Sequence, residues 1–231
     1  MSLLLSLAIV PLVAYAIRKP LGKHPAVFYA LALLVCGISF CIITTPGSDP
    51  IVRVIGDLFQ KGRLAFALFA LVMFIGVAKP QSALRNAFMS IRANLSIIAS
   101  IFIVVHVVIY GTNYSTFIGT LAALRPNVVF SLIASLVLVA LLIALASTSF
   151  EHVKKKMRAS TWKTVQKTAY AFFAVIFVHL SGYLLFAAFQ GSAKAQVSYS
   201  IYLFVAGLYL ILRIRRARLD KLAPANSKES T

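Results

Sequence analysis

Seven apolar segments alternate with short polar segments along this chain of 231 residues. They lie at residues 2–17, 26–43, 64–78, 95–110, 128–146, 168–189 and 197–214. Most of them approach the roughly 17–25 residues that an α-helix needs to span a bilayer. The pattern predicts an all-α fold, a polytopic membrane helix bundle of six core transmembrane helices with one additional N-terminal helix.

Composition agrees with a membrane protein. Hydrophobic residues make up 61% of the chain and charged residues only 12%, whereas a soluble domain has about 25% charged residues. We expect three parts: an N-terminal anchor helix with a basic loop at 1–25, a membrane domain at 26–216, and a disordered cytoplasmic tail at 217–231. Basic residues follow the first segment instead of preceding it, which argues against a signal peptide. An interfacial helix is the alternative for this segment.

The basic residues indicate how the chain is oriented. The formal net charge is +18, but the lysines and arginines lie in the polar loops and not on a soluble face, so we expect no nucleic-acid partner. Alternate loops hold 18 of the 23 basic residues. The positive-inside rule places these loops and the C-terminus in the cytoplasm. We therefore expect an integral protein of a bacterial inner or plasma membrane, whose basic runs attract anionic membrane lipid.

Two histidines lie inside apolar segments. His106 is about 14 residues, or roughly 21 Å, along its segment, and His179 is about 17 residues, or roughly 25 Å, along a segment that enters from the same side. An ionisable side chain within a bilayer is costly and indicates a functional site. Neutral imidazole is an ordinary axial ligand of haem iron, so the pair predicts a haem site between two helices. Structural histidines that form hydrogen bonds across helices are the alternative.

Other residues are candidates for the same site. Gly182 is three residues after His179, and we expect it to provide space for a porphyrin. Arg125 lies just before the fifth apolar segment, and we expect it to pair with a haem carboxylate. A surface arginine that ends a helix is the alternative.

A second candidate site lies in the cytoplasmic half. Gln166 can donate and accept hydrogen bonds, Arg92 carries a fixed charge and Trp162 has a flat apolar face. Together with Tyr170 they predict a site for a quinone headgroup or a flavin ring such as that of FMN. The alternative is an interfacial tryptophan, topology-setting cations and a glutamine that packs between helices.

Three stretches of sequence carry a family resemblance. Residues 61–65 read Lys-Gly-Arg-Leu-Ala, residues 91–95 read Ile-Arg-Ala-Asn-Leu and precede His106, and residues 162–167 read Trp-Lys-Thr-Val-Gln-Lys and precede Tyr170 and His179. In this order, residues 26–215 resemble the ferric-reductase-like transmembrane family, most closely the haem-binding membrane subunits of periplasmic methionine sulfoxide reductase systems. In that family a histidine usually stands at the position of Gln166, thirteen residues before the one matching His179. The counterpart of this position, fourteen residues before His106, is Arg92. Neither residue is a usual haem ligand, so the resemblance implies that the cytoplasmic-side haem is missing and that a single haem b lies on the outer side.

The resemblance implies a function in electron transfer. We expect a membrane cytochrome b subunit of an oxidoreductase, which passes electrons from a quinol or a cytoplasmic flavoprotein to an extracytoplasmic reductase subunit or acceptor. The chain has no glycine-rich nucleotide-binding motif, so we expect it not to bind a nicotinamide. The alternatives are a membrane transporter, which would show interrupted helices or internal repeats, and a membrane anchor without a redox role.

Overall fold

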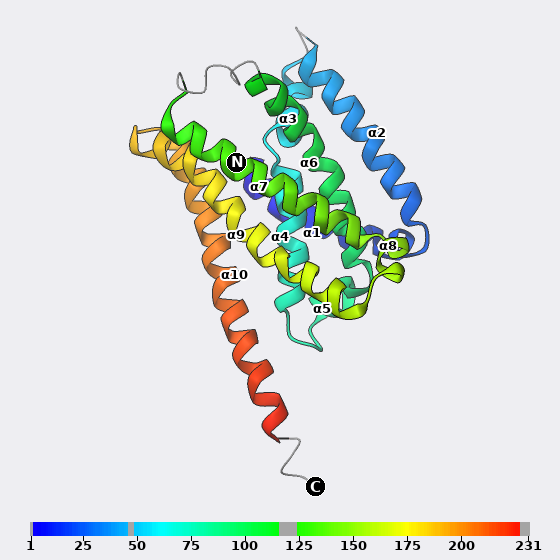
Figure 1. Cartoon of the computed structure of the whole chain (residues 1–231). Coiled ribbons are helices and arrows are strands. Elements are labelled where there is room, and N and C mark those ends of the chain that lie inside the picture. Colours follow the sequence, from blue (N-terminus) through cyan, green and yellow to red (C-terminus); the bar gives the residue numbers. More distant parts are fainter. Residues whose placement is uncertain (1, 46–48, 116–123, 227–231) are drawn as a thin grey trace.

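The computed structural model describes residues 2–45, 49–115 and 124–226, and all regular elements in these ranges are helices (Figure 1). In chain order they are α1 (Ser2–Lys23), α2 (Pro25–Thr44), α3 (Pro50–Gln60), α4 (Arg63–Val77), α5 (Ala83–Phe88), the short 3₁₀ helix η1 (Met89–Ile91), α6 (Arg92–Ser115), α7 (Pro126–Ser149), α8 (Glu151–Lys156), α9 (Ala159–Phe189) and α10 (Ala193–Asn226). Among the described residues, six helical segments are long and apolar enough to cross a membrane. The prediction of an all-α polytopic membrane helix bundle is confirmed.

Helix α4 is the centre of the bundle. It has 15 residues, and 11 of them are buried, as expected for a helix that is apolar on all sides. It packs against α1, α6 and α10. The sequence predicted α4 as one of six core transmembrane helices, but it is shorter than the six segments that could span a membrane. Because protein covers its surface, its backbone does not have to cross hydrocarbon by itself.

Helix α1 belongs to this core. One of its faces is buried, at intervals of three, four and seven residues that place side chains on one side of a helix; these residues are Leu3, Ser6, Val10, Ala14 and Leu21. Val10, Ala14 and Leu21 share a hydrophobic cluster with α4 and α6. The sequence predicted a separate anchor at 1–25. The packing makes α1 part of the same unit, because its buried face continues the core around α4.

Asn94 joins three helices through its side-chain amide. Its oxygen Oδ1 accepts a hydrogen bond of 2.9 Å from the hydroxyl of Tyr29 on α2. Its nitrogen Nδ2 donates a bond of 3.4 Å to the carbonyl oxygen of Leu21 on α1. Polar side chains that bond across helices hold membrane bundles together, since lipid is as apolar as the helix surfaces. Asn94 therefore fixes α1 and α2 against α6.

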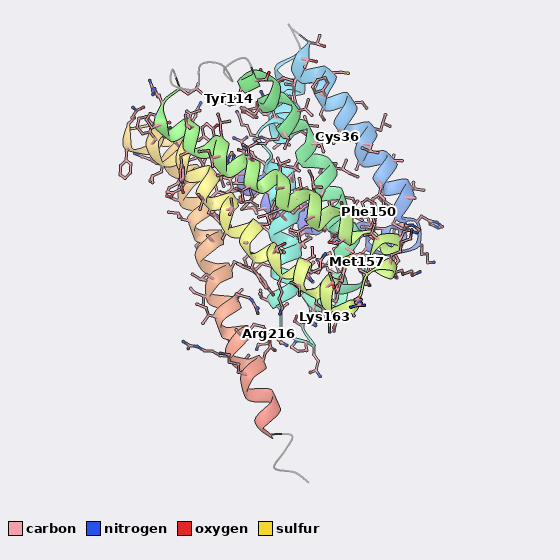
Figure 2. All side chains as sticks on the ribbon, in the orientation of Figure 1. Cys36, Tyr114, Phe150, Met157, Lys163 and Arg216 are labelled. Atoms are coloured by element: carbon pink, nitrogen blue, oxygen red, sulfur yellow. The ribbon has the colours of Figure 1, made fainter. Side chains whose placement is uncertain are left out.

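The helix ends separate the charges along the bundle. The α1–α2 turn, α5, α8 and the C-terminal part of α10 lie toward one end, and α3 and the α9–α10 turn lie toward the other (Figure 1). Figure 2 shows Lys163 and Arg216 toward the first end and Tyr114 at the opposite one. We call the first end, which carries the alternate loops rich in lysine and arginine, the basic end. The segregation of charge that the sequence predicted is thus present in the fold.

The C-terminal segment is helical beyond the predicted boundary. The sequence predicted disorder from residue 217, whereas α10 continues to Asn226, and residues 227–231 lie outside the described ranges. Arg216 and Asp220, one turn apart, form an ion pair of 2.8 Å. Such pairs at four-residue spacing stabilise a helix, so the polar composition of this segment is that of a charged helix.

The Asn94 junction can be tested by substitution. Asn94→Leu should lower the free energy of unfolding by about 1–2 kcal/mol, because two interhelical hydrogen bonds of this kind contribute about 0.6 kcal/mol each and the Tyr29 hydroxyl loses its acceptor. Tyr29→Phe should cost about half as much. Unfolding of the purified protein in detergent, followed by circular dichroism, measures both. If the double variant loses the sum of the two single effects, the two side chains do not interact.

Candidate functional site

His106 of α6 and His179 of α9 face each other within the bundle. Their ring centroids are 6.3 Å apart and their ring planes are nearly perpendicular, at 88°. Both residues are only partly exposed. The sequence predicted that the two imidazoles lie at one depth on helices that enter from the same side, and the structure brings them together.

The ring of His106 is oriented by the turn between α3 and α4. Its Nδ1 atom lies 2.7 Å from the carbonyl oxygen of Gln60, the last residue of α3. A carbonyl oxygen only accepts hydrogen bonds, so Nδ1 carries the proton and Nε2 of the neutral ring keeps a free electron pair. The turn continues through Gly62, whose φ of +62° favours glycine. A Cβ atom there would lie 3.0 Å from Cδ1 of Ile103 and 3.7 Å from the His106 ring.

The ring of His179 is oriented by α7 in the same way. Its Nδ1 atom lies 3.1 Å from the carbonyl oxygen of Ser131 and 3.0 Å from Oγ of Ser135. The Ser135 hydroxyl donates to the same Ser131 carbonyl at 2.8 Å. Because the Ser135 hydroxyl already donates to this carbonyl, Nδ1 of His179 carries a proton and donates a hydrogen bond to the same oxygen. Both histidines consequently present Nε2, and not Nδ1, as the free nitrogen.

A ladder of polar side chains on α7 holds α9 close. Asn127, Ser131 and Ser135 repeat every four residues and so share one face of the helix. The amide of Asn127 donates to the carbonyl oxygen of Gly182 at 2.8 Å, and the hydroxyl of Ser131 donates to that of His179 at 3.0 Å. Among the helix pairs, α7 and α9 make the most extensive contact.

Gly182 is the point of closest approach between these helices. A Cβ atom at this position would collide with Oγ of Ser131 and lie 2.8 Å from the carbonyl oxygen of Asn127. The sequence predicted that Gly182 provides space for a porphyrin. The structure corrects this expectation, because α7 fills the space that the missing side chain leaves.

The pair of imidazoles fits a single metal ion as two opposite ligands. Two metal–nitrogen bonds of about 2 Å, with about 1 Å more from each nitrogen to its ring centre, give roughly 6 Å between the rings; the observed distance is 6.3 Å. Histidines that bind metals commonly donate the other ring N–H to a carbonyl, which fixes the tautomer. Within the described ranges no group of three or more His, Cys, Asp or Glu side chains lies together. A haem needs only two such ligands, because the porphyrin supplies the others.

Aromatic side chains surround the pair on both helices. The ring of Tyr110 lies 4.7 Å from that of His106, and the ring of Tyr183 lies 5.5 Å from that of His179. Arg125, exposed at the start of α7, holds its guanidinium carbon 5.9 Å from the ring centre of Phe186. His179, Tyr183 and Phe186 are four and three residues apart and share a face of α9. Arg125 thus lies over the same face of α9, about two turns from His179.

The four residues of the predicted quinone or flavin site separate into two groups. Trp162 Nε1 donates to the backbone carbonyl oxygen of Thr148 at 3.0 Å. Gln166 Nε2 donates to the side-chain hydroxyl of Thr148, also at 3.0 Å. Both residues therefore fasten the start of α9 to the end of α7. Arg92 instead donates from Nε to the carbonyl oxygen of Val72 at 3.1 Å. Tyr170 lies under Arg213, whose guanidinium carbon is 4.4 Å from its ring centre.

The sequence interpretation missed the residues that orient the histidines. Ser131 and Ser135 could have been found, because polar residues at four-residue spacing in an apolar segment indicate a helix contact. Gly62 was visible as a glycine between two basic residues at a helix start. Gln60 acts through its backbone carbonyl, so its side chain carries no signal.

Comparison with known proteins finds a relative that is similar in sequence to this chain. It is an uncharacterized protein of Treponema pallidum (strain Nichols), 34% identical over 221 residues. The alignment covers 94% of this chain and 61% of the relative, so the chain spans about three fifths of the relative's length. No family model matches the chain, and no solved structure matches it. The similarity thus extends over nearly all of the described helices.

The α7–α9 contact predicts a position-specific effect. Gly182→Ala should destabilise the protein by about 1–3 kcal/mol, since overpacking forces the two helices apart. Gly207→Ala on α10 is the matched control, because a Cβ atom there meets nothing within 4 Å. The control should be neutral or stabilise by up to about 1 kcal/mol through helix propensity. Thermal unfolding in detergent compares the two variants, and equal effects would contradict the close approach at Gly182.

Proposed function

We propose that this chain is the membrane cytochrome b subunit of an oxidoreductase, and that it binds one haem b between His106 and His179. The observation that carries the proposal is the pair itself. Two imidazoles lie 6.3 Å apart, and each has its Nδ1 atom within hydrogen-bond distance of a backbone carbonyl oxygen. This leaves the Nε2 atoms of two neighbouring rings as candidate ligands for one metal ion.

The surrounding residues have definite tasks in this proposal. A bound haem b would supply a one-electron redox centre. The carbonyls of Gln60 and Ser131 would hold the rings in place and make each Nε2 a stronger electron-pair donor to the iron. Arg125 would neutralise a carboxylate at the outer edge of the site, where a charged group reaches water at the lowest cost. Its position over the face of α9 that carries His179 supports this task.

The proposal of one haem, and not two, rests on the residues at positions 166 and 92. Gln166 and Arg92 stand where a second pair of ligands would be expected from the resemblance to ferric-reductase-like proteins. Neither is an ordinary haem ligand. Their hydrogen bonds to Thr148 and to the Val72 carbonyl further support a structural use.

The direction of electron flow follows from the two ends of the bundle. The positive-inside rule would put the basic end and the C-terminus in the cytoplasm, leaving the histidine pair nearer the outer face. We infer that electrons arrive from a quinol or a cytoplasmic flavoprotein, with quinone or FMN as the donor cofactor, and leave to an extracytoplasmic reductase. The bacterial relative supports a bacterial inner or plasma membrane as the location.

Haem content tests the proposal directly. The purified protein should contain about one haem b per chain by the pyridine haemochrome assay, with a low-spin absorption spectrum. His106→Ala and His179→Ala should each abolish that spectrum, because one axial ligand is lost. The control variants His24→Ala and His152→Ala should retain it, since these histidines lie at the α1–α2 turn and in α8.

Two outcomes would contradict this reading. A colourless protein that does not take up haem would favour a transporter or a membrane anchor. Two haems per chain would contradict the single site and would require ligands other than histidine near Gln166 and Arg92.

The proposed task of Arg125 predicts a smaller effect. Arg125→Gln should weaken the binding of haemin by the haem-free protein about two- to fivefold, the range expected for a solvent-exposed ion pair. Lys194→Gln removes one positive charge at the same end of the bundle and should change the affinity less. Titration followed by Soret absorbance measures both affinities. An unchanged affinity in Arg125→Gln would remove this residue from the site.

A further inference from the structure

Four polar side chains gather between α4, α6, α9 and α10, toward the basic end. Arg213 stacks on Tyr170, with 4.4 Å between its guanidinium carbon and the ring centre. Arg92 interacts electrostatically with Tyr170 and Tyr209, and Arg213 interacts with Tyr209. We call Arg92, Tyr170, Tyr209 and Arg213 the two-arginine cluster. It is separate from the histidine pair and does not depend on a haem.

The positive charges of this cluster have no carboxylate counter-ion within the described ranges. Three carboxylates pair with other cations: Asp57 binds Lys61, Glu151 binds Lys154 and Lys155, and Asp220 binds Arg216. Among the described residues, no carboxylate forms an ion pair with Arg92 or Arg213. Both arginines are only partly exposed, so water compensates their charges incompletely.

Tyr209 adds a hydrogen-bonding group without a partner. Its side chain is only 8% exposed, and its hydroxyl is buried with no hydrogen-bond partner among the described residues. The rings of Phe173 and Phe74 pack against it, with centroids at 4.9 and 5.8 Å. A buried hydroxyl that lacks a partner is costly and rare in proteins, so this group indicates a ligand.

The cluster lies at the level where the apolar part of the bundle ends. Arg92 precedes the uncharged residues 93–115, and Arg213 follows the uncharged residues 197–212. Val72, the acceptor for Arg92, is five residues from the end of α4, or about 7.5 Å along the helix. Tyr170 is 44% exposed on the outer surface of the bundle. A group at the boundary between lipid tails and headgroups could therefore reach the cluster from the side.

We propose that the two-arginine cluster binds the phosphate group of an anionic phospholipid. Guanidinium groups are suited to phosphate oxygens in charge and geometry, and the Tyr209 hydroxyl can donate a further bond. A quinone ring, the ligand expected from the sequence for Arg92 and Tyr170, is neutral. It would leave both positive charges uncompensated, so the unpaired arginines favour an anion.

Native mass spectrometry of the full-length protein in neutral detergent tests the site, with phosphatidylglycerol as the added lipid. Arg213→Gln should raise the dissociation constant of the first bound lipid about tenfold, and Tyr209→Phe about threefold, as expected for charged and neutral hydrogen bonds. Arg216→Gln and Tyr202→Phe are matched controls. Arg216 is on the same helix but already pairs with Asp220, and Tyr202 is equally buried on α10. Both controls should stay within about twofold.

Three results would overturn the proposal. Equal weakening in Arg213→Gln and Arg216→Gln would show only diffuse attraction to the basic end. Competition by inorganic phosphate at the concentration of the lipid would assign the site to a soluble phosphate. Displacement of the lipid by a short-chain quinone would assign it to a neutral headgroup. Circular dichroism of each variant confirms folding, and a haem-free protein leaves the test unaffected.

Discussion

The close approach of α7 and α9 is the contact on which the rest of the bundle depends. In a bilayer, apolar side chains gain little by leaving lipid for each other, so small residues and polar contacts must hold helices together. Gly182 removes the side chain at the crossing, and Asn127 and Ser131 then reach backbone carbonyls of α9. The same geometry brings the Ser131 carbonyl to Nδ1 of His179. The helix contact and the orientation of the imidazole are therefore one feature.

The second histidine is held from a different part of the fold. The turn from α3 to α4 places the Gln60 carbonyl on His106, and α4 is fixed because it is buried at the centre of the bundle. Two independent supports thus hold two neighbouring imidazole rings by their Nδ1 atoms. The other end holds two arginines without carboxylate partners among the described residues. The proposed haem site and the proposed phosphate site would thus lie toward opposite ends of the bundle.

Hydrophobicity predicted the helices well because each apolar segment must satisfy its own backbone in lipid. The shared depth of His106 and His179 followed from helix rise and direction alone. The central place of α4, the role of Gly182 and the bonds of Trp162 and Gln166 to Thr148 did not follow. They depend on which helix faces which, and hydropathy does not specify neighbours. The helical segment after residue 217 was missed because a charged helix and a polar tail have similar composition.

Electron paramagnetic resonance of the oxidised protein tests the central claim most directly. The two imidazole planes are 88° apart, and perpendicular axial imidazoles leave two iron d orbitals nearly equal in energy. We therefore predict a low-spin ferric signal with strong anisotropy and one very large g value, which disappears in His106→Ala and in His179→Ala. A rhombic low-spin signal typical of parallel planes would contradict the ring geometry. A purely high-spin signal, or no haem signal, would contradict ligation by the histidine pair.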